Sequence, residues 1–154
     1  MLGKVKLYFG IEGLKMDLEI PDSFSLHEQS IHGSIRLHSK SAQVINSLTV
    51  TLIESYQRGR GKDLRTNDYE WGKISLKENI SIPSNGQKII DFRLPFNAQL
   101  SKIDALGAKS VVLKKFTNLM KLSKNAKSEF NIIVKADVEG TALNPEVKKK
   151  ISLS

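Results

Sequence analysis

The sequence of 154 residues contains no cysteine and only 4 prolines. Without thiols the chain has no disulfide framework, no thiolate zinc site, no iron–sulfur cluster and no cysteine nucleophile. No apolar run approaches the roughly 18 residues that indicate a membrane-spanning helix. The first residues, Met1 to Lys6, lack the apolar segment of a signal peptide. We therefore expect a cytoplasmic protein with no transmembrane segment.

Groups that could carry catalysis are equally scarce. The sequence has no serine-centred elbow, no glycine-rich phosphate loop and no His-Glu zinc motif. His32 and His38 share one predicted strand face, but at about 3.3 Å per residue their backbones lie roughly 20 Å apart, too far for one metal ion. His27 falls in a predicted loop. We expect a protein that is not an enzyme and that has no metal or cofactor site.

The clearest positive signal is an alternation of apolar and polar residues, which is typical of half-buried strands. Residues 44–56 are apolar on both faces and predict a central strand, with Val44, Leu48, Val50 and Leu52 on the same side. The other predicted strands are 14–20, 31–38, 69–78, 80–82, 87–94, 130–138 and 147–153. Many short strands with turn signals between them predict an all-β, immunoglobulin-like sandwich. At this length we expect a single domain, residues 1–154.

Two glycines and one loop are informative about the connections. The turn from Pro83 to Gly86 contains Asn-Gly, and Gly86 suits a position that needs a positive φ. Gly33 lies inside a predicted strand, where glycine often marks a bulge or a close approach of another backbone. Residues 57–67 are polar and include two glycines, so we expect a mobile loop there.

One segment, residues 109–124, has helical rather than strand periodicity. At 100° per residue its apolar side chains form one stripe, made by Val112, Phe116, Leu119 and Met120. The opposite face carries Lys114, Lys121 and Lys124. We therefore expect one amphipathic helix. The stripe either packs on the sandwich as core or serves as a partner surface.

Positive charge is concentrated in the second half of the chain. Lys and Arg number 24 against 16 Asp and Glu, a net charge of +8. Such a field favours an acidic protein, nucleic acid or an anionic lipid surface, or it only keeps the protein soluble. Tyr56, Tyr69 and Trp71 flank the basic loop, either as stacking platforms for single-stranded nucleic acid or as packed strand residues. The candidate interaction surface consists of Arg58, Arg60, Lys62, Arg65, Lys114, Lys121 and Lys124.

Several short stretches resemble the arrestin-like fold, in particular the N-terminal half of bacterial sporulation-control arrestin-like proteins. The matching stretches are 14–20, 31–37, 45–56, 80–86, 91–95 and 136–145. Within them Gly33, Gly86, Phe92, Leu94 and Pro95 occupy the family's turn and strand positions. The resemblance implies a β-sandwich and a scaffold or regulatory role without catalysis.

These observations predict a non-enzymatic protein-interaction module of arrestin-like type that binds an acidic surface of another protein. The alternative is a binder of nucleic acid or lipid headgroups through the basic face. A single sandwich also has edge strands that need covering. For that reason a homodimer is a further expectation.

Overall fold

The computed structural model describes residues 14–59, 61–77, 79–97, 126–140 and 144–154. Within them the chain forms nine strands and one short 3-10 turn, η1 (Gly61–Asp63). The strands are β1 (Leu14–Glu19), β2 (Ser23–Phe24), β3 (Ser30–Ser39), β4 (Gln43–Arg58), β5 (Arg65–Leu76), β6 (Ile80–Ile82), β7 (Gly86–Pro95), β8 (Ala126–Val138) and β9 (Glu146–Leu153). The predicted all-β character is confirmed. The expected helix over residues 109–124 lies outside the described residues.

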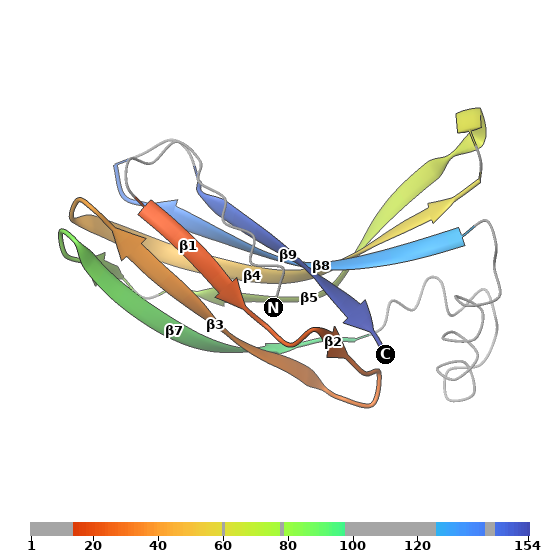
Figure 1. Ribbon diagram of the computed structural model, residues 1–154, viewed down its shortest axis with the longest axis horizontal. Coiled ribbons are helices and arrows are strands. Elements are labelled where there is room, and N and C mark those ends of the chain that lie inside the picture. Colours follow the sequence, from red (N-terminus) through yellow and green to blue (C-terminus); the bar gives the residue numbers. More distant parts are fainter. Residues whose placement is uncertain (1–13, 60, 78, 98–125, 141–143) are drawn as a thin grey trace.

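The strands form two sheets, which Figure 1 shows as two stacked layers. The smaller sheet has the order β1-β3-β7, and the larger has the order β2-β9-β8-β4-β5, with β6 also paired to β4. Every pairing is antiparallel except that of β2 with β9. The central position predicted for residues 44–56 is correct, because β4 pairs with β5, β6 and β8.

The core lies between the facing sides of the two sheets. Alternate residues of β1, β3, β8, β9 and the middle of β4 point inward, as period-2 geometry requires, and most of them are almost fully buried. Val50, in the middle of β4, has no exposed surface. The smaller sheet contributes Leu14, Met16, Leu18, Ile31, Ile35, Leu37, Phe92 and Leu94, and the larger sheet contributes Leu48, Val50, Leu52, Ile132, Val134, Ala136, Val147 and Ile151.

Two segments cross from the smaller sheet to the larger one and bring the sheets together at their edges. After β1 the chain passes to β2, where the Ser152 N–H donates to the Asp22 carbonyl at 3.0 Å beside β9. After β7 the Asn97 N–H donates to the Trp71 carbonyl of β5 at 2.9 Å. Each crossing carries a buried aromatic residue, Phe24 in the first and Phe96 in the second.

Two sequence predictions about β4 and its neighbours are wrong in detail. Ile45 rather than Val44 is fully buried, because the pairing of β4 with β8 shifts between Ile45 and Ser47. This irregularity reverses the facing of the residues before it. The loop expected over 57–67 is shorter, since β4 continues to Arg58 and β5 starts at Arg65. Polar residues form strands here because cross-strand pairing continues beyond the core.

The glycines behave partly as predicted. A Cβ on Gly33 would lie 2.7 Å from the Glu19 carbonyl oxygen, so the predicted close approach is correct. In the turn before β7 it is Asn85, at φ 58°, that takes the left-handed conformation expected at Gly86. Gly86 is needed for a different reason. A Cβ there would meet the Pro83 ring at 2.5 Å.

Candidate functional site

The candidate site is a three-stranded extension of the larger sheet, called here the ribbon. It consists of residues 55–58 of β4, residues 65–68 of β5, residues 126–129 of β8 and the connection 59–64. The pairing of β9 with β8 stops at Phe130 and Ile151, so among the described strands residues 126–129 pair with β4 alone. Figure 1 shows this part of the sheet rising away from the two-layer body.

A bulge in β5 lies between the ribbon and the rest of the larger sheet. Leu52 pairs with Gly72 and Ile53 with Glu70, which leaves Trp71 as an extra residue in β5. A bulge of this kind bends the strand and increases its twist. The bend turns the Trp71 side chain into the core, where it is only 3% exposed.

Four aromatic side chains pack below the ribbon. Trp71 stacks edge-on against Phe130, with ring centroids 4.8 Å apart, and Phe24 contacts Phe96 at 5.1 Å in the same manner. Phe24 also lies 5.3 Å from Phe130 and 6.1 Å from Trp71. Such edge-to-face pairs contribute about 0.5–1.5 kcal/mol each beyond their buried area. The cluster therefore provides a firm base for the ribbon.

A carboxylate is buried at this base. Glu54 has no exposed surface, and it continues the inward-facing row of Leu48, Val50 and Leu52 along β4. The indole Nε1–H of Trp71 donates to Glu54 Oε1 at 3.0 Å, and the Ser128 hydroxyl donates to Glu54 Oε2. One side chain on the central strand thus links β5 to β8. These hydrogen bonds replace water around the buried carboxyl group.

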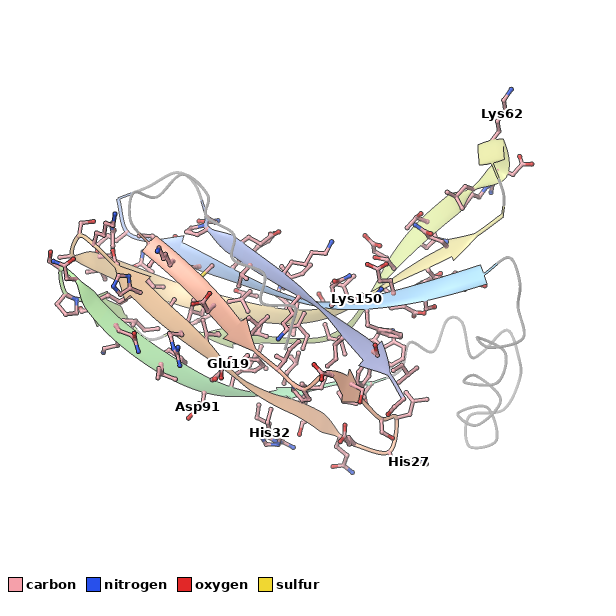
Figure 2. The ribbon with its side chains drawn as sticks, viewed as in Figure 1. Glu19, His27, His32, Lys62, Asp91 and Lys150 are labelled. Atoms are coloured by element: carbon pink, nitrogen blue, oxygen red, sulfur yellow. The ribbon has the colours of Figure 1, made fainter. Side chains whose placement is uncertain are left out.

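The far end of the ribbon is basic. Residues 57–67 contain four basic side chains and one acidic one, Asp63. Arg58 and Arg65 are direct register partners across the β4–β5 hairpin, and Lys62 lies in η1 between them. Figure 2 shows Lys62 at the outermost end of the hairpin.

Three of the seven predicted interaction residues are therefore brought together by the hairpin, namely Arg58, Lys62 and Arg65. Arg60, Lys114, Lys121 and Lys124 lie outside the described residues. The stacking-platform hypothesis fails for Trp71, which is buried and hydrogen-bonded. Tyr56 and Tyr69 are half-buried. The packed interpretation of these aromatic residues is the better one.

Two residues of the site were missed by sequence reasoning. Glu54 shares the parity of its buried neighbours, so the alternation of β4 already placed it in the core. Leu64 is an apolar residue in a polar connection, and it is 51% exposed next to Arg65. A single apolar residue in an otherwise polar segment could have identified Leu64 as a candidate site residue from the sequence.

The rest of the described surface provides fewer side chains that could bind a ligand or take part in a reaction. A hollow of about 540 Å³ beside Gly33 is lined by Glu19, His32 and Asp91, among others, and Figure 2 labels these three on the smaller sheet. Among the described residues no group of three or more His, Cys, Asp or Glu side chains could hold a metal ion. No helix capable of crossing a membrane occurs in that part of the chain.

Comparison with known proteins identifies the relatives. The solved structure of Spo0M, a sporulation control protein of Bacillus subtilis, superposes with a TM-score of 0.65 at 14% sequence identity. The match covers 94% of this chain and 50% of that one, so this chain spans about half the length of its structural relative. No curated protein sequence matches significantly.

At that level of identity the structural match supports a shared fold and nothing further. The fold is arrestin-like, as in Spo0M. The model of the Spo0M family, described as SpoOM protein, matches residues 2–119, which is more than half of the chain. The predicted resemblance to sporulation-control proteins is confirmed. The chain belongs to the Spo0M family.

Proposed function

We propose that this chain is a non-enzymatic, cytoplasmic interaction module that binds an acidic surface of another protein through the ribbon. The observation that carries the proposal is the hairpin, which places Lys62 at its outermost end, with the exposed Arg65 at the start of β5. Membership of a family that includes a sporulation control protein supports a regulatory role.

The base of the ribbon supports this function because hydrogen bonds and packed aromatic rings anchor the docking element to the core. Hydrogen bonds among Glu54, Trp71 and Ser128 connect the three strands near the point where the ribbon leaves the core. An element held in one conformation loses little conformational freedom on binding, so more of the contact energy appears as affinity. Clustered positive charge also accelerates the encounter with an acidic partner.

The test is a charge reversal with a matched control. Lys62→Glu with Arg65→Glu changes two exposed residues of the ribbon, and Lys88→Glu with Arg93→Glu changes two exposed residues of β7. Both pairs replace one lysine and one arginine, so the change in net charge is identical. The probe is a fluorescein-labelled polyglutamate peptide, followed by anisotropy and stopped-flow at low salt.

We expect the ribbon variant to bind roughly tenfold more weakly, mostly through a slower association rate, and the β7 variant to change much less. Equal losses in both variants would mean that only net charge matters, and the ribbon would not be the docking element. A single-stranded oligonucleotide serves as the second probe. Tighter binding to it, with a steep dependence on salt, would favour the nucleic-acid alternative instead.

A further inference from the structure

The outermost part of the ribbon carries an exposed apolar side chain. Leu64 is 51% exposed, and the other large hydrophobic residue exposed to this degree in the described chain is Ile89, at 54% on β7. Single exposed apolar residues are common and need no explanation by themselves. Leu64 differs from Ile89 in its position, because it lies at the end of a projecting hairpin.

The surroundings of Leu64 are basic and its backbone is fixed. Its N–H donates to the Gly61 carbonyl at 3.3 Å, which closes η1. Lys62 and Arg65 are exposed on either side of it in sequence. Asp63, between Lys62 and Leu64, is exposed as well. Among the described side chains of this turn, Leu64 is therefore accompanied by two positive charges and one negative charge.

The shape of this end argues for a lipid surface. A standard protein interface buries about 800 Å² on each partner, more than the few residues of one convex turn can offer. Lipid headgroups adapt to a convex insertion, and basic groups beside an apolar side chain are the usual chemistry of attachment to anionic membranes. Nucleic acid fits less well, because binding to single strands uses aromatic stacking and Trp71 is buried.

We propose that the end of the ribbon inserts Leu64 into an anionic lipid surface, with Lys62 and Arg65 at the level of the headgroups. This goes beyond the proposed protein interaction. It assigns Leu64 to lipid, whereas Lys62 and Arg65 also belong to the surface proposed for the acidic protein partner. Asp63 opposes the attachment, because a carboxylate is repelled by anionic headgroups.

The first experiment measures sedimentation of the protein with vesicles. One set contains equal parts of phosphatidylglycerol and phosphatidylcholine, and the other contains phosphatidylcholine alone. We expect binding to the anionic vesicles only, weakened by salt. Leu64→Ala should reduce partitioning roughly tenfold through the lost methylene groups, whereas Ile89→Ala, the matched control, should leave it unchanged. Asp63→Asn should strengthen it.

The second experiment tests whether the side chain at position 64 enters the apolar part of the lipid layer. The chain has no cysteine, so Leu64→Cys or Ile89→Cys can each be labelled with an environment-sensitive fluorophore at one position. We expect a blue shift with anionic vesicles for the label at position 64 and none at position 89. The absence of that shift, or equal binding by Leu64→Ala and the parent, would overturn the insertion. Binding of Leu64→Ala to polyglutamate tests the proposed function separately, so the two proposals can fail independently.

Discussion

Replacing Glu54 by leucine tests whether its carboxylate stabilises the base of the ribbon. The side chain has no exposed surface, and it accepts hydrogen bonds from the Trp71 indole and the Ser128 hydroxyl. Leucine has a similar volume and leaves no large cavity. The substitution therefore removes the acceptor while preserving the packing.

The expected loss follows from the two donors that remain. A buried donor without a partner costs roughly 1–3 kcal/mol, so two donors cost about 2–6 kcal/mol. Ser128 is half-buried and can turn toward water, which favours the lower half of that range. The free energy of unfolding of a domain is typically about 5–15 kcal/mol, so the change is large. Glu54→Gln keeps one acceptor oxygen and should lose about 1 kcal/mol.

The assay uses the chain's one tryptophan, which is Trp71 itself. Its fluorescence reports urea unfolding, and its spectrum reports the loss of the indole hydrogen bond in the folded state. We expect the order of midpoints to be parent, Glu54→Gln, then Glu54→Leu. A leucine variant as stable as the parent, or more stable, would refute the reasoning, because burial of the carboxylate would then cost more than its hydrogen bonds return.

Two further predictions concern the sandwich itself. Val50→Asp places a carboxylate at a fully buried position between the sheets and should destabilise the protein by several kcal/mol; a thermal melt like that of the parent would contradict the placement of β4. Gly33→Ala introduces a Cβ 2.6 Å from Phe92 Cζ and 2.7 Å from the Glu19 carbonyl, and it should cost about 1–3 kcal/mol in urea unfolding. Ser34→Ala on the same strand is its control, and an equal effect of both would indicate that the close approach carries no penalty.

Much of the fold could be predicted from residue order because strand alternation is a local property. Burial on one side of a sheet forces apolar residues to every second position, so Leu14, Met16 and Leu18 identify β1 without knowledge of its neighbours. The same parity applies to Glu54, although its carboxyl group gave no reason to expect burial. At positions where the alternation breaks, it was harder to predict which side chains are buried. The facing of Val44 depends on an irregularity that forms only when β8 pairs with β4.

The candidate site depended far more on tertiary structure. The sequence by itself determined that Arg58, Lys62 and Arg65 lie in one polar segment, and that a protein rich in β-strands carries them. It did not determine that the segment is a paired hairpin projecting from the body. That outcome requires the extra residue at Trp71, which bends β5, together with the absence of β9 pairing beyond Phe130. Both arise from contacts between strands distant in sequence, and no local pattern of residues encodes such contacts.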